Sequence, residues 1–168
     1  MRQFKALGPP VPRSAGSRRR PHALIVDDNL SNQVVASAIC EVLGYTCEWV
    51  SSGKQAIETA AHGGFDVVLM DICMPLMDGV EATLKIRSLP TNAALVPIIA
   101  VTANADSCDR ARYLAAGMCA VVAKPIEIPA LCAAMEQAIA GGLGAGDETR
   151  QTCPPKTSGG TASSSLRH

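Results

Sequence analysis

Short apolar runs alternate with longer amphipathic stretches between about residues 23 and 140. The runs are mostly apolar and have the length of strands: Ala23–Val26, Thr46–Val50, Phe65–Met70, Val96–Val101 and Ala120–Ala123. Short runs of this kind are typical of strands that are buried on both faces of a parallel sheet. We therefore predict five strands of a parallel sheet.

A helical pattern follows each of these runs. After the first run, apolar residues recur at helical spacing and predict an inward-facing stripe made of Val35, Ala38, Ile39 and Val42. The stretch after the last run carries a similar stripe, made of Leu131, Met135, Ala138 and Ile139. Gly44 is typical of a residue that ends a helix, and Pro129 of one near a helix start.

Five strands that alternate with five helices predict an α/β fold. Right-handed crossovers between parallel strands place helices on both faces of the sheet, which gives a three-layer doubly wound domain. Ligands in such folds bind beyond the carboxyl ends of the strands. Functional residues are therefore expected directly after the apolar runs.

Polar side chains stand at the ends of four of the runs. Asp27 and Asp28 follow the first run, Asp71 the third, Thr102 the fourth, and Lys124 the fifth. Each has an ordinary explanation when taken alone, such as a helix cap, a turn or a solvated charge. Because all of them are expected at one edge of the sheet, we interpret them as a single site.

Three neighbouring carboxylates repel one another unless a cation neutralises them. Mg²⁺ is the natural candidate, because it binds one or two carboxylates together with a carbonyl, waters and a phosphate oxygen. A carboxylate beside such an ion can act as a nucleophile and form an aspartyl phosphate. Lys124 would supply a second positive charge and Thr102 a hydrogen-bond donor, which is what phosphoryl transfer requires.

The same segments resemble the receiver domain of two-component response regulators. The motifs that carry the resemblance are IVDDN at 25–29, LMDICMPLMDG at 69–79, VTAN at 101–104 and AKPI at 123–126. The resemblance covers residues 23–140, and the sequence around the motifs is most similar to that of receivers in hybrid sensor kinases and phosphorelays. It implies a flavodoxin-like, CheY-like fold with strand order 2-1-3-4-5.

The resemblance also implies a role for each site residue. Asp71 would accept a phosphoryl group from a histidine kinase or a histidine phosphotransfer protein, while Thr102 and Lys124 would bind the phosphoryl oxygens. Lys124 would precede a cis peptide bond to Pro125. The implied Mg²⁺ ligands are Asp27, mainly through water, then Asp28, Asp71 and the backbone carbonyl of Cys73.

One position departs from the family pattern. Three residues before the lysine, receivers usually carry a Tyr or Phe whose ring moves inward with the threonine, but this chain carries Val121. A valine cannot move in the same way. We therefore expect phosphorylation to remodel the surface around residues 105–135 only weakly, or the protein to act mainly as a phosphate relay.

Two other classes of function were weighed against a phosphoacceptor. A scaffold that keeps the receiver fold without using phosphate would have no need for clustered, repelling carboxylates. An enzyme that turns over a separate substrate is not expected, because a receiver catalyses only its own phosphotransfer and dephosphorylation. The phosphoacceptor is therefore the leading hypothesis and the scaffold the alternative.

The two ends of the chain differ from its middle in composition. Residues 1–22 form a basic arm: the first twenty residues contain six basic residues and no acid, whereas residues 21–140 contain thirteen acids and six basic residues. The arm fits a linker better than a nucleic-acid, lipid-binding or transit segment, because no amphipathic period accompanies the charge. Residues 141–168 are rich in Gly, Ser, Thr and Pro, which is typical of a disordered tail.

The composition also bears on location and partners. No apolar stretch reaches the length of a membrane span, and the start of the chain does not resemble a secretory signal. Seven cysteines without a CxxC pair suggest apolar packing in a reducing compartment. We expect a cytoplasmic protein that acts through a downstream protein target, without direct DNA binding.

Overall fold

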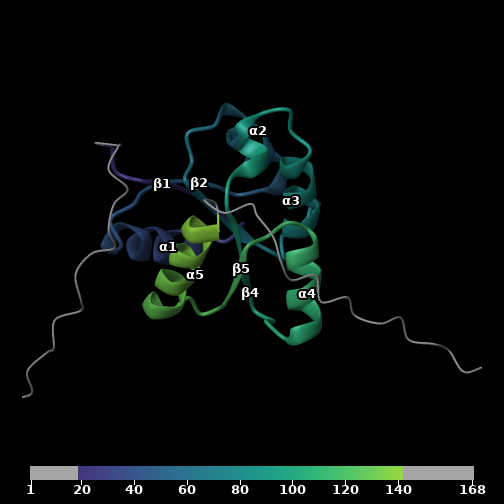
Figure 1. The fold of residues 1–168 in the computed structure, drawn as a ribbon. Coiled ribbons are helices and arrows are strands. Elements are labelled where there is room, and N and C mark those ends of the chain that lie inside the picture. Colours follow the sequence, from purple (N-terminus) through teal and green to yellow (C-terminus); the bar gives the residue numbers. More distant parts are fainter. Residues whose placement is uncertain (1–18, 142–168) are drawn as a thin grey trace, which may run out of the picture.

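Helices and strands alternate along the part of the chain that the computed structural model describes, residues 19–141 (Figure 1). Residues 1–18 of the predicted arm and residues 142–168 of the predicted tail lie outside it. The elements in chain order are β1 (His22–Val26), α1 (Leu30–Val42), β2 (Thr46–Val50), α2 (Gly53–His62), β3 (Val67–Asp71), α3 (Gly79–Arg87), the 3₁₀ helix η1 (Asn92–Leu95), β4 (Ile98–Thr102), α4 (Ser107–Ala115), β5 (Ala120–Ala123) and α5 (Ile128–Gly141).

The five strands form one parallel sheet with the order β2-β1-β3-β4-β5. Every residue of β3 and of β4 is buried, as the continuous apolar runs predict. The predicted doubly wound fold and its strand order are therefore confirmed.

Helices cover both faces of the sheet and make two separate cores. On one face α1 and α5 pack over Ile25, Leu69 and Ile99, and on the other α2, α3 and α4 pack over Leu24, Val68 and Ile98 (Figure 1). Neighbouring residues of one strand thus point into different cores. None of the helices within residues 19–141 is long and apolar enough to cross a membrane.

The inward face of α1 differs from the predicted stripe. Ile39 is buried as predicted, but Ala38 is exposed and Val35 and Val42 are 50% and 74% exposed. The buried face of this helix is made instead of Gln33, Ala36, Ile39 and Cys40. Spacing alone was misleading here because α1 has apolar residues on its solvent side as well.

One smaller prediction also needs correction. Ile139 of α5 is exposed, although Leu131, Met135 and Ala138 of the same stripe are buried as predicted. Asp71 and Thr102 are the last residues of β3 and β4 and so stand at the strand ends, as predicted. Both side chains are therefore held by the sheet itself.

Candidate functional site

The order of the strands in the sheet changes direction at β1: β2 lies on one side of it, and β3, β4 and β5 follow on the other. The chain passes from β1 outward to β2 and then returns across β1 to β3, so β1 and β3 are neighbours with carboxyl ends at the same edge. In open α/β sheets such a reversal leaves a crevice between the loops that leave the two strands. Asp27 and Asp28 follow β1 and Asp71 ends β3, so the acids meet at this crevice.

The three predicted carboxylates form a compact cluster. An oxygen atom of each of Asp27, Asp28 and Asp71 lies within 4.8 Å of the other two. Asp27 and Asp71 are buried, whereas Asp28 is exposed to solvent. The cluster is therefore open on one side, where Asp28 lies.

Lys124 binds both buried carboxylates. Its Nζ lies 2.8 Å from Oδ2 of Asp27 and 2.9 Å from Oδ2 of Asp71. Burial raises the pKa of the Asp71 carboxyl above its usual value, although the hydrogen bond from Lys124 acts in the opposite direction. Burial alone would lower the pKa of Lys124, but its hydrogen bonds to Asp27 and Asp71 outweigh this and raise it. One ammonium group thus binds two of the three clustered carboxylates, so the cluster keeps a net negative charge that attracts a further cation.

Thr102 is buried at the end of β4, which is adjacent to β3 and separated from β1 by it. Its hydroxyl donates to the carbonyl of Asn104 at 3.0 Å and accepts from the backbone N–H of Asn104 at 3.1 Å. The carbonyl of Thr102 accepts from the backbone N–H of Lys124 at 2.7 Å. The threonine is at the predicted edge, with its hydroxyl engaged by its own loop.

The turn from β3 to α3 brings backbone close to Asp71. The N–H of Cys73 donates to Oδ1 of Asp71 at 3.2 Å, while the Cys73 side chain is exposed. A Cβ atom on Gly79 would clash with the carbonyl oxygen of Asp71, so only glycine fits there without displacement of the backbone. The bond between Lys124 and Pro125 is cis, which confirms the expectation for this peptide.

Val121 is half-buried on β5 and packs against the core under α2, α3 and α4. Tyr113 of α4 is buried in the same core. The weak remodelling expected from Val121 stays a prediction.

Sequence reasoning missed the residues that hold Asp27. The backbone N–H of Asn29 and the side-chain amide of Asn32 donate to Oδ1 of Asp27 at 2.8 and 3.1 Å. Gln33 is buried, and its amide donates to the carbonyl of Asp27 at 2.6 Å. Asn32 and Gln33 on the first turn of α1 resemble ordinary surface residues in the sequence, where nothing distinguishes them from other polar helix residues.

The donor set at this edge fits a hard divalent cation. Carboxylate and carbonyl oxygens are the ligands that Mg²⁺ prefers, and no nitrogen or sulfur ligand belongs to the cluster of Asp27, Asp28 and Asp71. Among the described residues these three are the group with a spacing suited to a metal ion.

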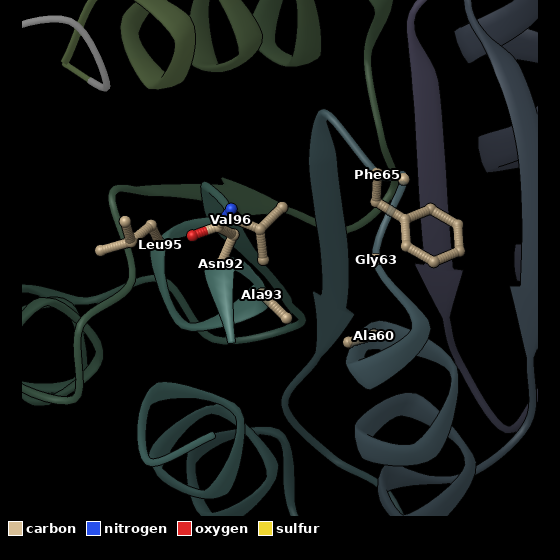
Figure 2. A pocket seen from close by; sticks show the side chains of 8 residues that line it. Ala60, Gly63, Phe65, Asn92, Ala93, Leu95 and Val96 are labelled. Atoms are coloured by element: carbon tan, nitrogen blue, oxygen red, sulfur yellow. The ribbon is translucent and has the colours of Figure 1, made fainter. Parts of the chain in front are cut away.

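A separate pocket of about 200 Å³ lies away from the acids (Figure 2). Its lining comes from the end of α2, the segment before β3, and η1. These segments precede β3 and β4, so the pocket lies at the amino ends of the strands. The side chains that line it are Ala60, Phe65, Asn92, Ala93, Leu95 and Val96, none of which is ionisable.

The fold and this site define a class of protein: a doubly wound domain with an acidic cluster at its strand reversal and a lysine bound between two aspartates. The family model for the response regulator receiver domain matches residues 23–136, which is more than half of the chain. The protein belongs to the response regulator receiver domain family.

Its relatives include sensor kinases that are much longer than this chain. It is 39% identical over 104 residues to the autoinducer 2 sensor kinase/phosphatase LuxQ of Vibrio vulnificus, covering 62% of this chain and 12% of LuxQ. It is 43% identical over 104 residues to the signal transduction histidine-protein kinase BarA of Escherichia coli, covering 62% of this chain and 11% of BarA. The chain therefore matches only about one tenth of the length of these relatives.

Solved structures agree with this assignment. The receiver domain of sensor histidine kinase PA1611 from Pseudomonas aeruginosa is 39% identical, with a TM-score of 0.66, covering 73% of this chain and 99% of that domain. That structure has a magnesium ion in its active site cleft. The chemotaxis protein CheY4 of Vibrio cholerae is 25% identical, with a TM-score of 0.66, covering 71% of this chain and 99% of that one.

Proposed function

We propose that this chain is a phosphoacceptor that receives a phosphoryl group on Asp71 from a phosphohistidine of a partner protein. The observation that carries the proposal is the position of Asp71, a buried carboxylate at the crevice that shares Lys124 with Asp27. A buried, repelled carboxylate costs free energy unless its charge is used or neutralised. Membership of the receiver family supports the same role.

Each residue of the site has a part in the proposed transfer. A carboxylate oxygen of Asp71 attacks phosphorus, the bond from phosphorus to the histidine nitrogen breaks, and its electron pair stays on the imidazole. Lys124 neutralises negative charge on the transferred group, and Thr102 donates its hydroxyl to a phosphoryl oxygen. Positioning and charge neutralisation of this kind supply most of the catalysis in phosphoryl transfer.

A magnesium ion is part of this proposal. Asp27, Asp28, Asp71 and the carbonyl of Cys73 would hold it, since carboxylate oxygens already lie within 4.8 Å of one another. The ion would neutralise the cluster and the incoming phosphoryl group. The magnesium in the cleft of the 39% identical receiver from Pseudomonas aeruginosa supports this assignment.

The exposed face of α1 supports a protein partner as donor. Leu30 and Val34 are 63% and 60% exposed, and Glu41 is the one charged residue of the whole helix. Because α1 begins two residues after Asp28, this apolar face adjoins the acidic crevice. Exposed apolar patches of this kind are typical of protein interaction sites. We infer that a helical surface carrying the phosphohistidine docks along α1, and that a downstream protein target reads the phosphorylated domain.

The experiment that tests the proposal is phosphorylation with acetyl phosphate and Mg²⁺, followed by intact mass measurement. We expect the wild type to gain one phosphoryl group that hydroxylamine removes, as an acyl phosphate requires. The variant Asp71→Asn is expected to gain none, and EDTA to prevent the reaction.

Asp106→Asn is the matched control, because Asp106 is exposed and its side chain makes no capping bond at the start of α4. It should be phosphorylated like the wild type. If the wild type gains no phosphoryl group from acetyl phosphate or from phosphorylated histidine domains, the scaffold alternative replaces the proposal.

A further inference from the structure

The three acids of the cluster differ in how firmly they are held. Both oxygens of Asp27 are engaged: Oδ1 accepts from Asn29 at 2.8 Å and from Asn32 at 3.1 Å, and Oδ2 accepts from Lys124 at 2.8 Å. Asp71 accepts from Cys73 and Lys124. The exposed Asp28 is the least constrained of the three. Asp27 is thus the fixed carboxylate of the site.

The backbone of Asp27 is held as well. Its carbonyl accepts from the amide of Gln33 at 2.6 Å, and its N–H donates to the carbonyl of Val50 at 3.2 Å. The same Gln33 amide donates to Oγ of Ser51 at 3.1 Å, which ties the ends of β1 and β2 together. Gln33 therefore fixes the backbone position of Asp27, while Asn32 fixes the rotation of the Asp27 carboxylate.

The bond from Asn32 limits what Asp27 can offer to a cation. A carboxylate oxygen has two lone pairs, and those of Oδ1 are both used, by Asn29 and by Asn32. A cation can then reach Asp27 only through the remaining lone pair of Oδ2, directly or through a water molecule. Bidentate binding by Asp27 is excluded as long as Asn32 stays bound.

This restriction distinguishes between divalent cations. Ca²⁺ accepts six to eight oxygen ligands in flexible geometry, often with a bidentate carboxylate, whereas Mg²⁺ requires six ligands near ideal octahedral positions. A carboxylate that is fixed in rotation and limited to one oxygen suits Mg²⁺ and disfavours Ca²⁺.

We propose that Asn32 is a positioning residue that makes the acidic site selective for Mg²⁺ over Ca²⁺ by holding Oδ1 of Asp27 away from the ion. The inference rests on the magnesium site of the proposed function. It assigns to α1 a role in the ion site in addition to its exposed apolar face.

The test compares Mg²⁺ and Ca²⁺ binding to the full chain, with MgCl₂ and CaCl₂ titrated separately and Kd measured by calorimetry or amide chemical shifts. In Asn32→Ala we expect the Kd for Mg²⁺ to rise about tenfold, the lower end of the cost of losing a hydrogen-bond partner of a metal ligand. The Kd for Ca²⁺ should stay the same or fall, because Oδ1 becomes available. Asn32→Gln, which keeps an amide on a longer side chain, should lie between.

Ser31→Ala is the matched control, since Ser31 is the exposed neighbour of Asn32 on the same turn and should leave both Kd values unchanged. Urea unfolding without ions shows whether each variant is folded. Gln33→Leu should lower stability and weaken both ions alike, because it loosens the backbone under Asp27.

Two results would overturn the inference. If Asn32→Ala and Asn32→Gln change the Kd for Mg²⁺ and the Kd for Ca²⁺ by the same factor, or change neither, Asn32 does not select the ion. That result would leave the proposed magnesium site itself unaffected. If the wild type binds no Mg²⁺, the metal part of the proposed function fails together with this inference.

Discussion

Lys124 is one ammonium group between two buried carboxylates, and this imbalance sets the electrostatics of the site. Burial raises the pKa of Asp71 in the folded protein despite the hydrogen bond from Lys124. An acid whose pKa is higher in the folded than in the unfolded chain stabilises the fold when it is protonated. That contribution is complete below the usual pKa of about 4 and is lost as pH rises through the raised pKa.

We therefore predict that, in the metal-free protein, the contribution of Asp71 to the free energy of unfolding depends on pH. In EDTA, the free energy of unfolding of the wild type relative to Asp71→Asn should fall as the pH is raised from 4 to 8. Each unit of pKa difference corresponds to about 1.4 kcal/mol. Urea unfolding of both proteins at several pH values measures this, and a difference that does not vary with pH would contradict the prediction.

The residues at the strand ends could be predicted from sequence because each follows or ends an apolar run. Asp27, Asp28, Asp71 and Lys124 are brought together by the fold as expected, and Thr102 lies at the same edge. The bonds that orient them could not be predicted. Asn32 and Gln33 act through side-chain amides on a helix, where polar residues are common for other reasons.

At the scale of the elements, α1 shows where hydrophobic spacing is insufficient. The helix places the polar Gln33 inside and the apolar Val34 outside, so a stripe chosen by hydrophobicity is rotated from the true inner face. The inner amide of Gln33 donates to the carbonyl of Asp27, and the outer apolar residues Leu30 and Val34 lie on the part of the helix that begins next to the crevice. The central strands β3 and β4 were easier to predict because both of their faces are buried.

Arg87 joins several elements at the end of α3. Its guanidinium donates to the carbonyls of Ala94 and Val96 at 2.9 and 2.8 Å, and twice to the carbonyl of Gly117 at 3.1 and 2.7 Å. It thereby connects α3 to η1 and to the turn between α4 and β5. These carbonyls would lose a charged donor if Arg87 were removed.

We predict that Arg87→Met lowers the free energy of unfolding by about 2 to 4 kcal/mol, because the partly buried carbonyls of Ala94 and Val96 and the exposed carbonyl of Gly117 lose their charged hydrogen-bond donor. Urea unfolding measures the change. Arg112→Met is the matched control: Arg112 makes an exposed ion pair with Asp78 at 3.7 Å, whose loss should cost less than about 1 kcal/mol. Equal losses in the two variants would show that the carbonyl contacts of Arg87 contribute little.

At the scale of the whole molecule, the two helical layers separate the surfaces that partners can use. The layer of α1 and α5 carries the exposed Leu30 and Val34 of α1, whereas α3 lies in the opposite layer (Figure 1). A donor that docks along α1 should therefore be insensitive to changes on α3. A small donor such as acetyl phosphate should be insensitive to both.

We predict that Val34→Asp slows phosphotransfer from a phosphorylated histidine phosphotransfer domain by about tenfold or more, because it places a charge in an apolar contact. Phosphorylation by acetyl phosphate should be unchanged. The measurement uses the domain, from a panel, that transfers fastest to the wild type. Leu84→Asp on α3 is the matched control, since Leu84 is 54% exposed and similarly apolar. Equal slowing by both variants would show that docking does not use α1.

The contact between Lys124 and Asp27 joins residues 97 positions apart in the chain. Closing so long a loop costs conformational entropy, although this cost grows only slowly with loop length. A chain that stopped after β4 would keep all three acids without the ammonium group that lies between two of them. The ion ligands are thus complete before β5 is reached, whereas the positive charge that binds Asp27 and Asp71 arrives only with the segment that follows β5.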